Sequence, residues 1–429
     1  MTNPLRRLLP LPAAVALVSC LSAPTAAAAP GPPAPAAGCA LPGRTGWTDE
    51  GHDTDRTQFQ PATGTRRVLT LYVDFPDAPA TDSTEPYAAH LAPAADWMGR
   101  ASHGRLRLEN TPLHRWIRMP ADSTSYGFTR GLTFEAHEKY LRDAITAADP
   151  YADFSRYDMV YVVPAKAATA IPFSPTYLYD PATPGITADG TRLKWAVTFG
   201  QDMWHWGPKV AAHETAHTFG LPDLYAFTGA PHQYVGGWDL MGDIAGHAPQ
   251  YLGWHSWKLG WTRDDQVACL PASGRRTVRL TPVERPGGTK IAVLRTGETT
   301  AYVAESRRAE GNDAAACSSG VLIYRVDSAA RTGEGPVRIM NANPGRAPAR
   351  RLRPAGPGRV RTRTELHRPR VRRAHRRPRG RTHGRHGAAE QGVNPVRARP
   401  PFTRSRATLA AGGPAGSVPI TRGRRVPAG

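Results

Sequence analysis

The sequence predicts an α/β (α+β) domain, then a β-rich module that we expect to be truncated, and finally a disordered basic tail. Three observations support this order. Strand-like and helix-like patterns alternate as far as residue 220, short strand-like runs follow Trp261, and apolar periodicity disappears from about Asn341. We assign residues 66–262 to the first domain, 263–340 to the module and 341–429 to the tail.

The first domain begins with an apolar strand at Val68–Phe75, which Pro76 closes. An amphipathic helix is expected at residues 133–149, with Thr133 as its capping residue. The same alternation predicts a helix at residues 87–102 that is interrupted at Pro93, and a pair of short strands at residues 104–120. Two buried strands are expected at residues 157–164 and 192–199. The module should contain four short strands, at residues 275–284, 289–297, 300–308 and 320–328.

The N-terminal residues 1–29 have the pattern of a secretion signal. Two arginines precede the apolar run Leu8–Val18, and small residues at Ala26–Ala29 offer a cleavage site. We therefore expect a secreted, extracellular protein. The alternative is a lipoprotein anchored through Cys20, because the letters LVSC fit a lipoprotein cleavage box. Neither this run nor any later one is long enough for a transmembrane helix.

Residues 30–65 are rich in Pro, Ala, Gly and Thr, which predicts a linker or a short pro-segment. Removal of the signal leaves three cysteines, Cys39, Cys269 and Cys317. An oxidising exterior favours a disulfide, and the simplest pairing is Cys269 with Cys317, within one C-terminal region. This pairing leaves Cys39 without a partner.

The net charge of +20 is confined to the tail. Residues 341–429 hold 23 of the 55 basic residues and two of the 35 acidic residues. The first 340 residues therefore hold 32 basic and 33 acidic residues, which gives them a net charge of −1. Nucleic-acid binding by the folded body is therefore not expected. The tail alone allows a different reading, a secreted basic protein that binds polyanions.

The tail also suggests a damaged reading frame. The module stops in mid-pattern, and the Arg, Pro, Gly, Ala and His that follow are typical of a GC-rich gene read out of frame. We hypothesise a frameshift between roughly Ile339 and Arg351. The protein would then be an inactive or unstable product with an intact motif.

The residues with the clearest chemistry are His213, Glu214 and His217. Gly207 and Pro208 suit the start of a helix. Residues four apart on a helix differ by roughly 40° around its axis, so both histidines project from one face. Two imidazole nitrogens can bind one zinc ion, and Glu214 would lie beside the ion as a base.

A catalytic zinc ion needs a third protein ligand and one open position. Gly220 allows the chain to leave the helix sharply, and Pro222 prevents its continuation. Asp223 follows this exit and is the favoured third ligand. A glutamate on a later helix is not favoured, because the next one, Glu284, lies in the β-rich region. Weaker rivals for the third position are His232, His247, Asp239 and Asp243.

The stretches HETAHTFGLPDLY, GGWDLMG and APQYLGWHSWKLGW resemble the immune inhibitor A-like family of secreted bacterial zinc metalloproteases. The resemblance covers about Arg66 to Asp327 and implies a metzincin-like fold. It also implies zinc ligands at His213, His217 and Asp223, a general base at Glu214, and a structural methionine turn at Met241. The chain departs from the family's pattern in the C-terminal quarter.

These observations predict a secreted zinc metalloendopeptidase that hydrolyses peptide bonds in extracellular proteins. The expected cofactor is one catalytic Zn²⁺ ion, and the expected partners are protein or peptide substrates. A structural Ca²⁺ ion is compatible with the sequence, although no motif marks a site for it. The oxyanion could be stabilised by Tyr225, by Tyr234 or by a histidine near the cleft.

Overall fold

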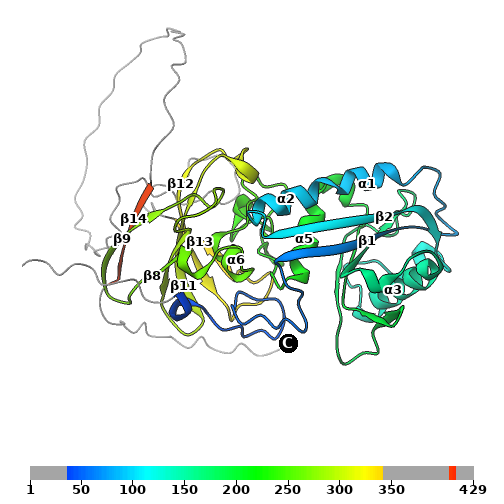
Figure 1. The fold of residues 1–429 in the computed structure, drawn as a ribbon, viewed down its shortest axis with the longest axis horizontal. Coiled ribbons are helices and arrows are strands. Elements are labelled where there is room, and N and C mark those ends of the chain that lie inside the picture. The colour runs from blue at the N-terminus through cyan, green and yellow to red at the C-terminus, as the bar shows by residue number, and fades with distance from the viewer. Residues whose placement is uncertain (1–35, 342–404, 412–429) are drawn as a thin grey trace, which may run out of the picture. The chain divides into compact units, whose positions relative to one another are not determined.

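The structure is a computed structural model that describes residues 36–341 and 405–411. The predicted signal peptide, the alternative lipidation site at Cys20 and most of the predicted tail lie outside the described residues. The described residues form a mixed α/β architecture, as predicted, with two five-stranded sheets, two two-stranded sheets and short helices (Figure 1). No helix in these two ranges combines the length and apolar content needed to cross a membrane.

The strands of the first half are β1 (Gly64–Asp74), β2 (Leu106–Arg118), β3 (Met159–Pro164), β4 (Thr176–Leu178), β5 (Ile186–Ala188), β6 (Thr191–Leu193) and β7 (Trp195–Thr198). Five of them form a sheet in the order β2-β1-β3-β7-β4, while β5 and β6 pair with each other. Strands β1, β2, β3 and β7 are parallel, and the edge strand β4 is antiparallel to β7. The two short strands predicted at residues 104–120 are instead one strand, β2. Its register with β1 shifts between Thr70 and Tyr72, because a bulge absorbs the interruption in the pattern.

The helices are α1 (Glu85–Leu91), α2 (Pro93–Ala101), α3 (Phe134–Ala148), α4 (Met203–Trp206), α5 (Lys209–Thr218) and α6 (Gly253–Lys258). The predicted break at Pro93 separates α1 from α2, and Thr133 caps α3 by accepting a hydrogen bond from Ala136 N. Side chains alternate across β1, so Leu69 and Leu71 share a core with α3. Val68, which points to the opposite face, shares a core with α1, α2 and α5. The sheet is thus covered on both faces (Figure 1).

The strands of the second half are β8 (Val267–Cys269), β9 (Gly274–Leu280), β10 (Ile291–Arg295), β11 (Thr300–Arg307), β12 (Gly320–Asp327), β13 (Val337–Ile339) and β14 (Ser405–Ala411). The second sheet has the order β13-β12-β11-β10-β8 and is antiparallel except for the pair β8 and β10. The four predicted module strands are confirmed as β9 to β12. Strand β14 corrects the expected disorder of residues 341–429 in part, because it pairs with the backbone of β9.

One hydrophobic cluster joins the two predicted domains. It contains Ala212 of α5, Met241 and Trp254 from the first half, together with Ile291 and Tyr324 from the second. Each of these side chains is almost completely buried. The helix that carries the two histidines therefore rests on a core to which the β-rich module contributes directly.

Residues 36–63 are packed into this body, so the described part is not an unstructured linker, and the alternative of a short pro-segment stays a prediction. The segment begins with a short 3-10 helix at Ala36–Cys39, which contacts β8. Leu41, Phe59 and Ala62 are buried. The free energy gained by burying these apolar side chains explains why a stretch rich in Pro, Gly and Thr is ordered.

The disulfide joins Cys39 to Cys269, with an S–S distance of 2.04 Å. This corrects the predicted pairing of Cys269 with Cys317, which is free and exposed. The physical reason is that the N-terminal segment packs against β8 and brings Cys39 next to Cys269. Sequence proximity is a poor guide to such a contact, since 230 residues separate the two cysteines.

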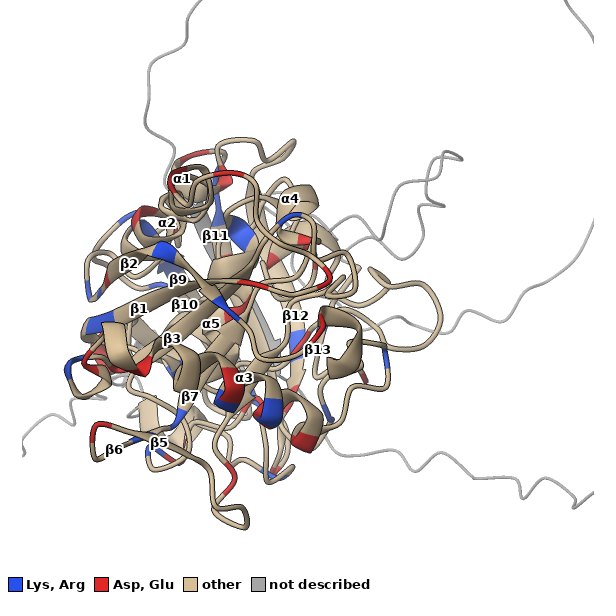
Figure 2. Ribbon diagram, turned by 90° about the vertical axis from the view of Figure 1, so that its right-hand side faces the viewer, with Lys and Arg blue, Asp and Glu red and all other residues tan. Residues whose placement is uncertain are grey.

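Charged residues of both signs are interspersed along the described chain (Figure 2). This mixture agrees with the formal charge of −1 for the first 340 residues. The expectation that the folded body does not bind nucleic acid stays a prediction.

Candidate metal centre

Helix α5 carries the predicted motif and is buried along most of its length. The helix begins where Gly207 and Pro208 indicated: Pro208 is its N-cap, and Gly207, with a φ of +69°, ends the preceding helix α4. His213 and His217 lie on one face of the helix, with their ring centroids 5.0 Å apart. The helical spacing therefore brings the two rings together as expected.

The chain leaves α5 at Gly220, whose φ of +95° favours glycine. A side chain would also be cramped there, since a Cβ atom would lie 3.1 Å from Thr54 Cγ2. The exit is closed by hydrogen bonds from Gly220 N to His217 O (3.0 Å) and from Leu221 N to Ala216 O (3.2 Å). This turn directs Asp223 back toward the histidines.

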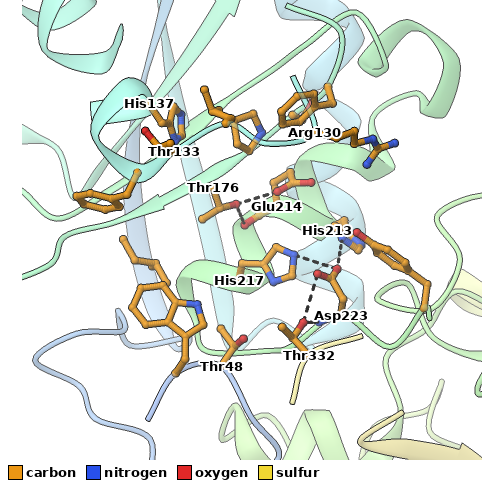
Figure 3. A pocket seen from close by; sticks show the side chains of 18 of the residues that line it. Thr48, Arg130, Thr133, His137, Thr176, His213, Glu214, His217, Asp223 and Thr332 are labelled. Carbon is orange, nitrogen blue, oxygen red and sulfur yellow. Dashed lines mark hydrogen bonds and ion pairs between the residues drawn. The ribbon is translucent and has the colours of Figure 1, made fainter. Parts of the chain in front are cut away.

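The three predicted ligands converge (Figure 3). Asp223 Oδ1 lies 3.2 Å from His213 Nε2 and 3.3 Å from His217 Nε2. A tetrahedral zinc site with bonds of about 2.0–2.1 Å places neighbouring ligand atoms about 3.3–3.4 Å apart. Within the described ranges, His213, His217 and Asp223 are also the one group of at least three His, Cys, Asp or Glu residues close enough together that they could hold a metal ion.

The hydrogen bonds of the two imidazole rings support the same conclusion. His213 Nδ1 lies 3.1 Å from Leu240 O, and His217 Nδ1 lies 2.8 Å from Leu221 O. A carbonyl oxygen only accepts, so each Nδ1 carries a proton, and each Nε2 faces the Asp223 carboxylate. When a ring is neutral, its Nε2 lone pair can bind a cation that also contacts Asp223. The residues therefore fit a divalent metal ion, with its outer hydrogen bonds already in place.

The pKa values report the same preference for positive charge. Burial lowers the pKa of the His217 imidazole, but Asp223 and then Glu214 outweigh burial and raise it to about 9. Burial raises the pKa of Asp223, but the two histidines outweigh it and hold this pKa well below its ordinary range. The buried site thus stabilises a cation next to the Asp223 carboxylate.

Glu214 lies beside this triangle and not in it. Its carboxylate Oε2 is 2.9 Å from the hydroxyl oxygen of Thr176, on the edge strand β4. Burial raises the pKa of Glu214 and outweighs the opposing influence of the two histidines. A buried carboxylate held next to a metal site is the arrangement that a general base needs.

The predicted methionine turn at Met241 lies directly against helix α5. Met241 is completely buried in the same cluster as Ala212. Leu224 N donates to Met241 O at 2.9 Å, and Leu240 O is the carbonyl that holds His213. These contacts place Met241 where it supports the positions of both His213 and Asp223.

The weaker rivals for the third ligand lie outside this group. His232 Nδ1 bonds to Gly242 O, and Asp243 accepts a hydrogen bond from Ala245 N. Asp239 accepts from Met241 N and Leu252 N and pairs with the buried His255 ring at 2.9 Å. These contacts give Asp239 and Asp243 structural roles.

The site opens into a cavity of about 400 Å³. Apolar side chains line it together with the three proposed ligands and Glu214, and Arg130 also lies at its wall (Figure 3). Tyr225 is a further lining residue. Burial raises the pKa of the Tyr225 phenol well above its ordinary value, so its hydroxyl stays a neutral donor. Tyr234, the other candidate, is not among the lining residues; its ring lies under Arg338.

Sequence reasoning missed most of the residues that line the cavity, among them Trp47, Thr176 and Thr332. Trp47 comes from the supposed linker and is 45% exposed. Thr176 is on a three-residue strand, and Thr332 is in a turn of the β-rich module. None of them belongs to a motif, so no local signal marked them.

Comparison of the sequence with models of known protein families and with curated proteins finds no match. The proposed function therefore rests on the geometry of the site.

Proposed function

We propose that the protein is a secreted zinc-dependent endopeptidase of a metzincin-like type, related to the immune inhibitor A-like proteases that its motifs resemble. The observation that carries the proposal is the triangle of His213, His217 and Asp223 with the buried Glu214 carboxylate beside it. Two imidazoles and one carboxylate, with a fourth position left for water or substrate, form a ligand set typical of catalytic zinc.

The residues have distinct roles in this proposal. His213, His217 and Asp223 would hold Zn²⁺, which when bound acidifies water and polarises a carbonyl group. Glu214 accepts the proton of the attacking water and passes it to the nitrogen of the leaving amine. The neutral Tyr225 hydroxyl is the best-placed donor for the oxygen that gains charge, because Tyr225 lines the cavity and its ring stacks against His213.

The cavity suits a peptide. Thr176 and Leu178 of β4 line it, and β4 is the last strand of its sheet, so its outer edge can pair with an extended chain. Apolar side chains from separate segments, among them Trp47, Phe134 and Phe173, offer contacts to substrate side chains. An open strand edge accommodates the interior of a chain as well as its end, which supports endopeptidase activity.

The disulfide between Cys39 and Cys269 supports the proposed secretion. Such bonds persist in oxidising, extracellular compartments and are rare in the cytosol. It agrees with the signal-like residues 1–29, which the structure does not describe.

The test compares purified wild type with Glu214→Ala. We expect both to contain about one zinc ion per chain by elemental analysis, whereas casein cleavage by the variant falls about 10²- to 10⁴-fold, the usual contribution of a general base. A chelator should abolish wild-type cleavage, and added Zn²⁺ should restore it. Glu135→Ala, at an exposed position of α3, is the matched control. Cleavage by Glu214→Ala at the wild-type rate would contradict the mechanism.

A further inference from the structure

The turn between β12 and β13 reaches across from the β-rich module to the third metal ligand. Thr332 Oγ1 accepts a hydrogen bond of 2.9 Å from Asp223 N and lies 3.4 Å from Asp223 Oδ2, to which it can donate. Gly333 N donates to Asp223 O at 3.1 Å. The turn thus contacts the main chain of Asp223 on both sides and its carboxylate as well (Figure 3).

The position of this turn is fixed from both ends. Strand β13 pairs with β12, and Ile339 N donates to Tyr234 O at 2.9 Å. Gly333 O accepts from Phe227 N at 3.1 Å, and Gly333 has a φ of +73°. A Cβ atom there would lie 2.2 Å from Phe227 Cγ, so only glycine allows this close approach.

The two oxygens of the Asp223 carboxylate have different partners. Oδ2 faces the Thr332 hydroxyl, and Oδ1 faces the two histidines. Without the hydroxyl, the carboxylate could turn about its own bonds and would lose rotational entropy on metal binding. Outer partners of this kind typically change metal affinity by 10- to 100-fold.

We infer that Thr332 is a positioning residue for Asp223, so that the β-rich module completes the metal site. This inference rests on the proposed function for the identity of the metal. It goes beyond that function by assigning part of the metal affinity to a residue 109 positions away from the ligand it orients.

The experiment measures the affinity of the metal-free protein for Zn²⁺ by competition with a chromophoric chelator, and records the visible spectrum of the Co²⁺ form. Thr332→Val keeps the shape and removes the hydroxyl, and should weaken Zn²⁺ binding 10- to 100-fold and alter the Co²⁺ spectrum. Thr332→Ser restores the hydroxyl and should bind within about threefold of wild type. Thr187→Val, at an exposed position of β5, is the matched control.

Thermal unfolding of the metal-free variants separates a positioning role from a folding role. We expect Thr332→Val and Thr332→Ser to have closely similar Tm values without metal. Should Val prove unfolded, Thr332→Ala provides a second variant without the hydroxyl. Wild-type Zn²⁺ affinity in a folded variant lacking the hydroxyl overturns the inference and leaves the proposed function intact. A wild type that binds no Zn²⁺ overturns both.

Discussion

The hydroxyl oxygen of Thr176 lies 2.9 Å from Oε2 of Glu214 and 2.9 Å from the main-chain oxygen of the same residue. The edge strand next to the proposed substrate position therefore also holds the proposed base. An unsupported glutamate side chain has several rotamers, and this contact favours the one in which Oε2 faces Thr176. In the proposed mechanism, strand β4 would thus link the binding of a peptide to the orientation of Glu214.

Thr176→Val should therefore impair turnover more than binding. Loss of a hydrogen bond to a charged group costs about 1.5–3 kcal/mol, which corresponds to roughly a 10- to 100-fold decrease in kcat. We expect zinc content to stay at the wild-type level, because Thr176 does not contact the metal ligands. Steady-state kinetics on a fluorogenic peptide, with Thr176→Ser as the control, measure the effect. An unchanged kcat for the valine variant would show that Glu214 needs no such support.

The disulfide between Cys39 and Cys269 should contribute strongly to stability. It closes a loop of about 230 residues, for which loop-closure entropy predicts about 5 kcal/mol, at the upper end of measured values. Replacing both cysteines by serine should lower the free energy of unfolding by 2–5 kcal/mol in urea titrations. Cys317→Ser, at a free and exposed position, should change it by less than about 0.5 kcal/mol. The reverse order of these effects would restore the pairing of Cys269 with Cys317.

Features that depend on residues close together in the sequence could be predicted. The close approach of His213, His217 and Asp223 could be predicted because all three lie within one short stretch of the chain. Helical spacing sets the positions of the histidines, and the exit from the helix at Gly220 and Pro222 sets that of the aspartate. Strands β9 to β12 could be predicted for the same reason, since each is an apolar run between turn residues.

Contacts between distant segments could not be predicted in this way. Cys39 meets Cys269 because residues 36–63 pack on β8, and Thr332 meets Asp223 because β13 pairs with β12. Both contacts depend on the whole core and leave no periodic signal. Composition was misleading for the same reason: the Pro- and Gly-rich N-terminal segment is ordered by burial against residues that are remote in sequence.

The buried His255 ring should make stability depend on pH. Its two nitrogens lie 2.9 Å from Asp239 Oδ2 and 3.0 Å from Glu50 Oε1, and all three side chains are fully buried. Burial lowers the pKa of His255, but Glu50 and Asp239 outweigh it and raise the pKa to about 10. The stabilisation is complete below the unfolded value of about 6.5 and is lost as pH rises toward 10, by at most about 1.4 kcal/mol per pH unit.

Other buried groups titrate in this range, so the comparison must be made with a variant. Burial lowers the pKa of Lys258 and of Lys290 to about 8, and these two groups act in the opposite direction. His255→Gln removes only the histidine contribution. The difference in unfolding free energy between wild type and His255→Gln should therefore be largest near pH 6 and shrink toward pH 10. The exposed-surface variant His205→Gln should leave the wild-type profile unchanged, and a difference independent of pH would refute a charged His255.

Truncation decides how much of the C-terminal region the metal site requires. A chain ending at Asn341 keeps β13 and the Thr332 turn, so it should bind Zn²⁺ and cleave casein within a few-fold of wild type. It loses β14 and exposes the edge of β9, so we expect lower solubility.

A chain ending at Ser328 loses Thr332 and β13 and should bind Zn²⁺ at least tenfold more weakly. Metal analysis after gel filtration, with casein assays on the monomer fraction, compares the three chains. If the chain ending at Asn341 binds no Zn²⁺, the region after β13 is part of the working enzyme, and the frameshift hypothesis loses its main support.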